Sequence, residues 1–283
     1  MELTLHAPAK VNLTLIVGAR RDDGYHDVST VMQTVGLYDT LTLTGGSGLT
    51  MTCTDPDLPT DGSNLVLRAA ALFCQELHLP VPDLHLHLQK RIPSQAGLGG
   101  GSSDAAAVLR AMRTLYAPEV SDAELERMAA ALGSDVPFFI RGGTALATGR
   151  GERLTPLPRL ADGWFVVVKP PEGFSTPAMY RRLDELPPQP PQPPQSDGMT
   201  AALGAGELRA VAAALCNSFE RAVPPDSAVW VIREALRAQG ALAAMLSGSG
   251  SAVFGLFDRE DAARAAAEVL RARWPLTFAA QPV

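Results

Sequence analysis

The sequence predicts an α+β protein with more than one domain. Segments with apolar residues at every second position are mixed with segments of helical periodicity, and their order is not the regular strand–helix alternation of a parallel α/β sheet. The chain has 283 residues, of which 46% are hydrophobic and 19% charged. It is therefore long enough for two hydrophobic cores.

The first segment, residues 3–17, alternates with period two and predicts a strand with one buried face. Val11 and Leu13 share its apolar face, whereas Lys10 and Asn12 share the other. Further strands are predicted at 28–35, 40–43, 49–53 and 84–90.

Three helices are predicted in the first half of the chain, at 63–77, from about 103 to 116, and at 121–133. Ser63 or Asn64 can cap the first helix. Ser121 and Glu124 form a capping box, and Gly133 is a C-terminal stop signal.

The second half begins with a compact buried strand at 164–169. The Pro/Gln-rich segment LPPQPPQPPQSDG (186–198) predicts a linker or surface insertion. Helices are predicted at 206–219, 229–240 and 258–273, and two strands around a Ser/Gly turn at 244–257. The last ten residues can form another strand.

Composition limits the classes of partner. The net charge of −6 argues against nucleic acid, which usually requires a basic surface. The sequence lacks both a secretory leader pattern and an apolar run of membrane-spanning length, so we expect a cytoplasmic protein without a membrane partner. The unpaired spacing of Cys53, Cys74 and Cys216 fits a reducing compartment. We assign no metal ligands, and the oligomeric state stays open.

The segment IPSQAGLGGGSSDAAA (92–107) places a glycine-rich loop directly before a helix. Free N–H groups and the helix dipole attract anions at such a position, and glycines allow phosphates to approach the backbone closely. Ser102 and Ser103 add hydroxyl donors. We therefore expect a phosphate-binding loop; the alternative is a flexible loop before a serine-capped helix.

Two common nucleotide loops are excluded by the spacing. A Walker A motif requires a lysine after the glycines, and the dinucleotide pattern from Gly97 and Gly99 places Ser102 where its last glycine should be. A nucleophile elbow is absent here and around Ser249. The loop thus belongs to another class of phosphate-binding protein.

Three segments together resemble the motifs of the GHMP kinases, the family of galactokinase, homoserine kinase, mevalonate kinase and phosphomevalonate kinase. They are APAKVNLTLIV, IPSQAGLGGGSSDAAA and MLSGSGSAVFGLF, in the family's order. The resemblance implies a ribosomal protein S5 domain 2-like domain over 1–156 and a ferredoxin-like α/β sandwich over 157–283. It also implies ATP with Mg²⁺, bound at Pro93, Gly97, Leu98, Gly99, Gly100, Gly101, Ser102 and Ser103.

Two further segments, RRDDGYHDVSTVMQTVGLYD and GSDVPFFIRGGTALATGRGE, resemble one branch of that family. Its members phosphorylate the 2-hydroxyl of a cytidine diphosphate ester of methylerythritol, in the non-mevalonate route to isoprenoid precursors. The resemblance implies that Asp135 is the general base and that Lys10 pairs with it and with the reacting oxygens. Without the resemblance, Asp135 reads as a turn aspartate and Lys10 as a solvent-facing strand lysine.

The resemblance also implies a substrate-binding set. Asn12 would contact the methylerythritol portion, Tyr25 and His26 the cytosine, and Tyr180 its other face. The Ser/Gly loop with Gly248 and Ser249 would close over phosphates; a flexible linker is rejected there because its flanks are apolar.

One residue departs from the family pattern, because Gln95 stands where a glycine is usual. Two rival functions remain open at this point. The first is a kinase of the same family with another alcohol as substrate, such as homoserine, mevalonate or a sugar. The second is a nucleotide-binding regulatory module that has lost catalysis.

Overall fold

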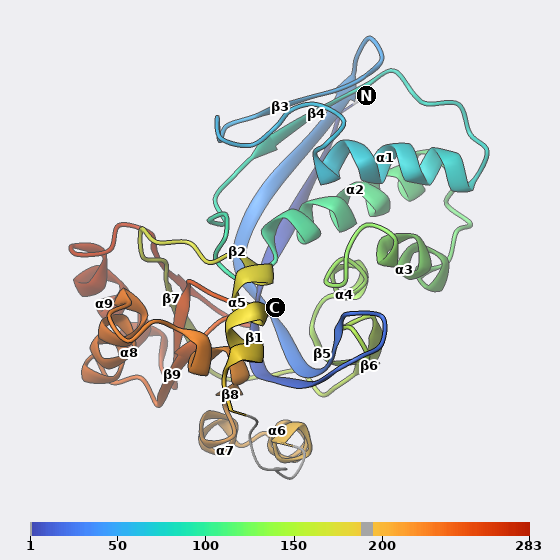
Figure 1. Ribbon diagram of the computed structural model, residues 1–283. Coiled ribbons are helices and arrows are strands. Elements are labelled where there is room, and N and C mark those ends of the chain that lie inside the picture. Colours follow the sequence, from blue (N-terminus) through green and yellow to red (C-terminus); the bar gives the residue numbers. More distant parts are fainter. Residues whose placement is uncertain (1, 188–194) are drawn as a thin grey trace. The chain divides into compact units, whose positions relative to one another are not determined.

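The computed structural model describes residues 2–187 and 195–283 (Figure 1). The chain forms two compact units. The first unit consists of the residues up to Ala9, Leu37–Ile92 and Gly99–Gly142, and the second of Lys10–Gly36, Pro93–Leu98 and Gly143–Val283. These units interleave along the sequence, so the domain boundary after residue 156 stays a prediction.

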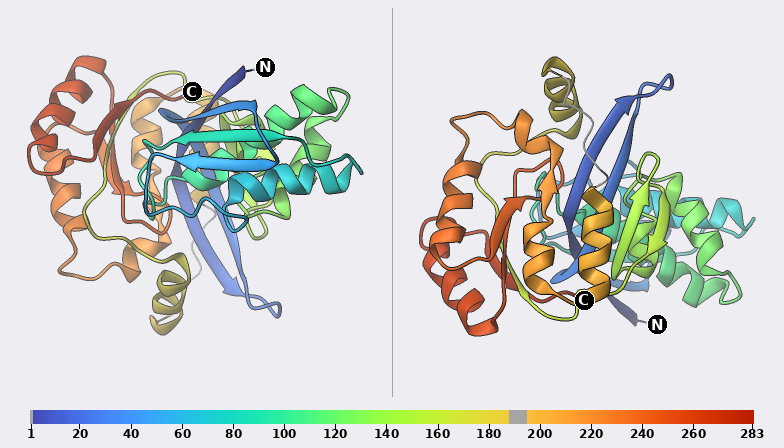
Figure 2. Two further views of the ribbon diagram at one scale, coloured as in Figure 1. Left: turned by 90° about the horizontal axis from the view of Figure 1, so that it is seen from above. Right: turned by 90° about the horizontal axis from the view of Figure 1, so that it is seen from below.

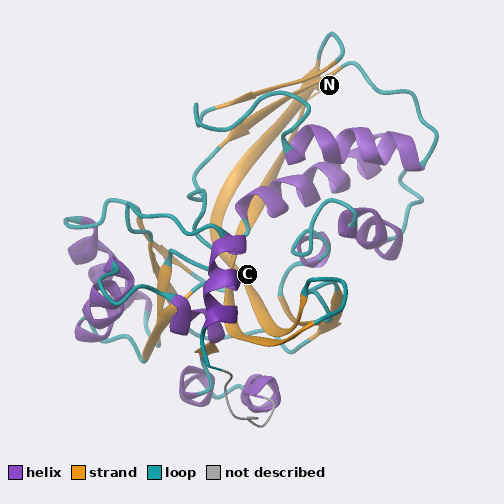
Figure 3. Cartoon of the chain, in the orientation of Figure 1, coloured by secondary structure: helices purple, strands orange, loops and turns teal. Residues whose placement is uncertain are grey.

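One mixed sheet has the strand order β3-β4-β2-β1-β8, with β5 paired to β2 and β6 paired to β5. Its two longest strands are β1 and β2 (Figure 3). Each of them contributes residues to both units. The bounds are β1 Glu2–Arg20, β2 His26–Gly45, β3 Leu49–Cys53, β4 Leu84–Gln89, β5 Thr144–Thr148, β6 Arg153–Pro156 and β8 Cys216–Asn217.

Four helices belong to the first unit: α1 Leu65–Glu76, α2 Gly100–Tyr116, α3 Asp122–Ala130 and α4 Phe138–Arg141. α1 packs along α2 (Figure 1). Asn64 caps α1 through its side chain, and the predicted capping box at Ser121 and Glu124 is present. Ala105, Ala106 and Ala107 of α2 are fully buried, and their small side chains let neighbouring elements approach closely.

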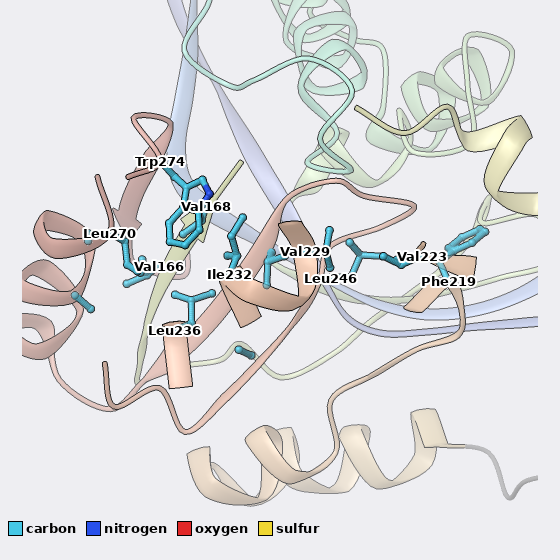
Figure 4. Close-up of a cluster of buried hydrophobic side chains, with 14 of the residues drawn as sticks. Val166, Val168, Phe219, Val223, Val229, Ile232, Leu236, Leu246, Leu270 and Trp274 are labelled. Atoms are coloured by element: carbon cyan, nitrogen blue, oxygen red, sulfur yellow. The ribbon is translucent and has the colours of Figure 1, made fainter. Parts of the chain in front are cut away.

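The second unit contains an antiparallel sheet of order β11-β7-β10-β9. Its strands are β7 Trp164–Val168, β9 Ala243–Leu246, β10 Val253–Phe257 and β11 Thr277–Ala280. Helices α8 (Ala228–Ala238) and α9 (Glu260–Arg271) contact each other and pack on this sheet (Figure 2). Their apolar side chains meet those of β7 in a buried cluster that includes Val166, Ile232, Leu236, Leu270 and Trp274 (Figure 4).

The remaining elements of the second unit are short helices: α5 Thr176–Glu185, α6 Gln195–Ala205, α7 Leu208–Ala213, and the 3-10 helix η1 Ser218–Ala222. The prediction missed α5. It was also wrong in extending one helix over 206–219, because α7 ends at Ala213 and β8 follows. Part of the predicted linker lies outside the described residues, and from Gln195 onward that segment is helical.

Three other predictions need correction. The strands predicted at 28–35 and 40–43 are one continuous strand, β2. The helix predicted from about 103 begins at Gly100. Strand β1 is buried on both faces from Ala9 to Leu15, not on one face. In the described part of the chain, no helix combines the length and the apolar character needed to cross a membrane.

Candidate active site

The glycine-rich loop has the backbone that its sequence predicts. Gly97 and Gly99 both have φ +73°, a conformation that L-residues with side chains rarely adopt. A Cβ on Gly97 would overlap the carbonyl group of Ser247, lying 2.9 Å from its carbon. Glycine is therefore required at position 97 by both conformation and space. Gly101 differs, because a Cβ there would meet only Leu65, at 3.8 Å.

Helix α2 starts inside the glycine run. Gly99 is its N-cap, and the first intrahelical bond runs from the Ser103 N–H to the Gly99 carbonyl, at 2.9 Å. The amides that precede Ser103 have no intrahelical acceptor, so this end can bind an anion. The Ser103 hydroxyl is fully buried and has no hydrogen-bond partner in residues 2–187 and 195–283. These features suit a phosphate group of a nucleotide.

The Ser/Gly segment between β9 and β10 is an ordered loop, as its apolar flanks predict. It contacts Pro93–Leu98. The Ser247 hydroxyl donates to the Gly97 carbonyl at 3.0 Å, and the Ser251 amide donates to the Gln95 carbonyl at 3.3 Å. The Ser249 hydroxyl lies 2.8 Å from that of Thr176. Hydrogen bonds within the second unit thus join the phosphate loop to the third GHMP kinase motif, MLSGSGSAVFGLF.

The side chain of Asn217 holds the Ser/Gly loop in place. Its side-chain amide donates to the carbonyls of Leu246 and Gly248, at 2.9 and 2.8 Å. Asn217 is buried, so both bonds form where competing water is scarce. The two bonds hold the loop's backbone at the end of β9.

Lys10 and Asn12 begin a buried polar network on one face of β1. The Lys10 ammonium donates to Asn12 Oδ1 at 2.6 Å, and the Asn12 amide donates to the Thr30 hydroxyl at 2.8 Å. Both Lys10 and Asn12 are only 3% exposed, so the alternative of a solvent-facing lysine is wrong. The backbone amide of Lys10 donates to the Leu98 carbonyl at 2.9 Å, which joins β1 to the phosphate loop. A buried ammonium fixed in this way can stabilise negative charge.

Asp135 lies in the turn between α3 and α4 and is half-buried. The Val136 amide donates to the Gly133 carbonyl at 3.2 Å, and the Val136 side chain is buried, so the backbone that carries Asp135 is anchored. Asp135 belongs to the first unit and Lys10 to the second. Their pairing stays a prediction.

The structure brings two of the three predicted cytosine-binding residues together. His26 and Tyr180 are stacked with ring centroids 4.9 Å apart and planes 13° from parallel. His26 Nε2 also lies 2.8 Å from Asp184 Oδ1, which can fix the tautomer of the ring. Sequence reasoning missed Asp184, whose helix α5 was itself not predicted.

Tyr25 is 56% exposed, and the guanidinium of Arg150 lies over its ring at 5.0 Å from the centroid. This is a cation–π contact on one face of the ring. The ring's exposure leaves apolar area to which a planar base can stack.

A buried ion cluster beside α2 was not predicted as a unit. The Lys90 ammonium pairs with Asp39 and, at 2.9 Å, with Asp104. Burial alone would lower the pKa of Lys90, but the two carboxylates outweigh it and raise it. Burial raises the pKa of Asp104 to about 7, against the attraction of Lys90. The available signal was the rarity of lysine, since only Lys10, Lys90 and Lys169 occur in the chain.

Gln95 adopts φ +50°, which explains why glycine is usual at its position in the family pattern. Its side chain lies against Gly173, where an added Cβ would come within 2.7 Å of the Gln95 amide oxygen. Gln95 thus holds, with a side chain, a left-handed backbone conformation that glycine adopts more easily. Among the residues described, no group of three or more His, Cys, Asp or Glu side chains is placed to hold a metal ion.

Two family models match this chain. GHMP kinases N terminal domain matches residues 64–143, and GHMP kinases C terminal matches residues 199–276. The homoserine kinase from Cytophaga hutchinsonii has a TM-score of 0.75 at 17% identity over 99% of this chain and 95% of that chain, which shows the shared fold. The class of protein is thus a GHMP-type small-molecule kinase.

More similar relatives narrow the class. The 4-diphosphocytidyl-2-C-methyl-D-erythritol kinase of Streptomyces avermitilis is 43% identical over 96% of this chain and 93% of its own length. That of Desulfitobacterium hafniense is 39% identical over 96% and 93%. A crystal structure of 4-(cytidine 5'-diphospho)-2C-methyl-D-erythritol kinase has a TM-score of 0.81 at 40% identity, over 99% of both chains. The chain belongs to the 4-diphosphocytidyl-2-C-methyl-D-erythritol kinase family of the GHMP kinases.

Proposed function

We propose that this kinase transfers the γ-phosphoryl group of ATP to the 2-hydroxyl of 4-diphosphocytidyl-2-C-methyl-D-erythritol, giving the 2-phosphate and ADP. One observation carries the proposal beyond family membership. A hydrogen bond from Ser247 to Gly97 holds the glycine loop against the Ser/Gly loop, so backbone groups of both loops are available to a phosphate chain. A cytoplasmic location stays a prediction.

Asp135 and Lys10 would carry the chemical step. The acceptor hydroxyl gives its proton to the Asp135 carboxylate as its oxygen bonds to the γ-phosphorus, and the bond from that phosphorus to the β–γ bridging oxygen breaks to release ADP. The Lys10 ammonium would stabilise the charge on the reacting oxygens. The short bond from Lys10 to Asn12 supports this role, because a held ammonium needs little reorganisation.

The phosphates of ATP would bind at the start of α2. Amides of the first turn and the Ser102 and Ser103 hydroxyls are the donors, and the buried unpartnered hydroxyl of Ser103 supports this assignment. Mg²⁺, when bound to the nucleotide, would neutralise charge on the β- and γ-phosphates. Water and phosphate oxygens can supply most of the ligands that Mg²⁺ prefers.

Tyr25, His26 and Tyr180 would recognise the cytosine. The exposed ring of Tyr25 supports stacking with a planar base, and the His26–Asp184 contact supports a ring held in one orientation for hydrogen bonding. Mevalonate, homoserine and galactose have no base. This set of residues therefore favours the cytidylated alcohol over those substrates.

The test is ADP release by the purified protein with Mg-ATP and four alcohols in parallel: 4-diphosphocytidyl-2-C-methyl-D-erythritol, mevalonate, homoserine and galactose. We expect turnover with the first alone and a new phosphomonoester signal in the phosphorus NMR spectrum. Turnover with another alcohol would refute the substrate assignment. ATP binding without turnover on any alcohol would instead favour a regulatory module.

A further inference from the structure

The Lys90–Asp39–Asp104 cluster lies beside the first turn of α2. A Cβ on Gly100, the first residue of that helix, would be 3.2 Å from the Lys90 ammonium. Asp39 is fully buried, Asp104 is 2% exposed, and the Lys90 side chain is 7% exposed. All three residues and the start of α2 belong to the first unit.

The two carboxylates are held unequally. Asp39 accepts from Lys90 through one oxygen, and through the other from the amides of Arg91 and Ile92, at 2.6 and 2.9 Å. Asp104 accepts from Lys90 through Oδ2, lies close enough to Asp39 for the two carboxyl groups to interact, and has a buried Oδ1 without a hydrogen-bond partner in the described part of the chain. A proton on the cluster is therefore most stable on Asp104.

One ammonium faces two carboxylates, so the fully ionised cluster carries a charge of −1 in a buried place. Such a charge is costly, and protonation removes it. The pKa of Asp104, raised by burial to about 7, agrees with this description. Asp104 can therefore gain or lose a proton near neutral pH.

The phosphate-binding end of α2 is close to this group. Asp104 is four residues after Gly100, which places it about 6 Å further along the helix axis. Phosphate charges at the helix start repel the Asp104 carboxylate through a low-dielectric interior. They therefore favour the protonated form of Asp104 more strongly than the empty site does.

We propose that binding of a nucleoside triphosphate at the N-terminus of α2 is coupled to uptake of a proton by the Lys90–Asp39–Asp104 cluster, with Asp104 as the receiving group. The proton comes from solvent and binds the Asp104 carboxyl group, which keeps its bond from Lys90 at Oδ2 and has Asp39 as its neighbouring acceptor. The cluster charge changes from −1 to 0. This inference rests on the proposed function, because it takes the nucleotide phosphates to bind there.

The other ionisable groups of the neighbouring elements do not fit this role. The charges of Lys90 and Asp104 both act on the pKa of the Cys53 thiol in β3. Burial is the larger effect and raises that pKa further from neutrality. On α1, Arg68 is exposed and Glu76 pairs with Arg127. Cys74 acts on the pKa of Tyr116, which is the last residue of α2 and so lies at the opposite end from Gly100. Further along α2, Arg110 donates to the Phe139 carbonyl. Asp104 is the acid among these that titrates near neutral pH.

The experiment is isothermal titration calorimetry of a non-hydrolysable ATP analogue with Mg²⁺ at pH 7, in buffers that differ in ionisation enthalpy. The slope of binding enthalpy against buffer enthalpy counts the protons exchanged. We expect an uptake of roughly half a proton beyond that of the Asp104→Asn variant. Asp57→Asn, an exposed turn aspartate of the same unit, is the matched control and should keep the wild-type slope.

A second measurement uses the wild-type protein alone. Uptake on binding means that affinity falls as pH rises, and we expect the Kd to increase roughly tenfold from pH 6.5 to pH 8.5. Equal slopes in the wild-type and Asp104→Asn proteins, or a Kd independent of pH, would overturn the inference. Absence of any nucleotide binding would instead refute the proposed function.

Discussion

Substituting Gly97 by alanine tests the contact between the phosphate loop and the third motif. Gly97 and Gly48 share φ +73°, but a Cβ on Gly48 meets no atom within 4 Å, whereas one on Gly97 overlaps the Ser247 carbonyl. Gly48→Ala therefore measures the backbone strain alone, about 1–2 kcal/mol. Gly97→Ala adds overpacking of about 1–3 kcal/mol.

The same substitution should reduce activity. The added Cβ would overlap the Ser247 carbonyl oxygen and lie 2.9 Å from its carbon, so relief to an ordinary contact of about 3.5–4.0 Å requires a displacement of about 1 Å or more. A misplacement of that size costs about 10²-fold in rate. We expect kcat/KM for ATP to fall by about that factor in Gly97→Ala and to stay at the wild-type value in Gly48→Ala.

Urea unfolding followed by circular dichroism measures the two free energies of unfolding, and ADP release measures the two rates. If Gly97→Ala loses no more stability than Gly48→Ala and keeps the wild-type kcat/KM, the two loops are not in the contact described. A loss of activity in Gly48→Ala would equally refute the reasoning, because that turn lies between β2 and β3 and not in the phosphate loop.

Three further substitutions probe other parts of the molecule. Asp135→Asn should lower kcat by about 10²–10⁴ with the ATP KM unchanged, as measured by steady-state ADP release; wild-type turnover would exclude Asp135 as the base. His26→Ala should raise the KM for the cytidylated substrate about tenfold through loss of one hydrogen bond, and an equal rise in the ATP KM would contradict a role in base recognition. The raised pKa of Asp104, about 7 against an ordinary 3.8, means that the native state holds this proton more tightly than the unfolded state. Its stabilising effect is thus complete below pH 4 and is lost as the pH rises to 7, so Asp104→Asn should remove about 2–4 kcal/mol from the pH dependence of unfolding over that range; an unchanged dependence would refute this.

The fold class could be predicted because the strands and helices carry clear periodicity, and the α+β prediction is confirmed. Helix α5 was missed although Ser175 at the N-cap and a proline in the first turn are both helix start signals. Strand β8 has only two residues, and its pairing with Thr14 and Leu15 of β1 defines it. Such long-range pairing leaves no local signal in the sequence.

The sequence predicted those relations in the candidate site that arise within one element, and not those between distant segments. Lys10 and Asn12 share a face of β1, as period-two alternation predicts, because strand geometry alone determines that relation. The Lys90–Asp39 pair joins residues 51 positions apart, and no local pattern indicates which aspartate a lysine will meet. Burial of the Lys10 face also escaped prediction, because it depends on what packs against β1.

The pairing of β1 with β8 also affects how the chain is made. The Val17 amide bonds to the Ser218 hydroxyl, which is 201 residues later in the sequence. At about 5–20 residues per second, a ribosome needs about 10–40 s to supply that partner. During this interval the edge of β1 is exposed to pairing with other chains. Slowing translation lengthens this vulnerable interval, so the yield of folded enzyme depends on how well the nascent β1 is protected.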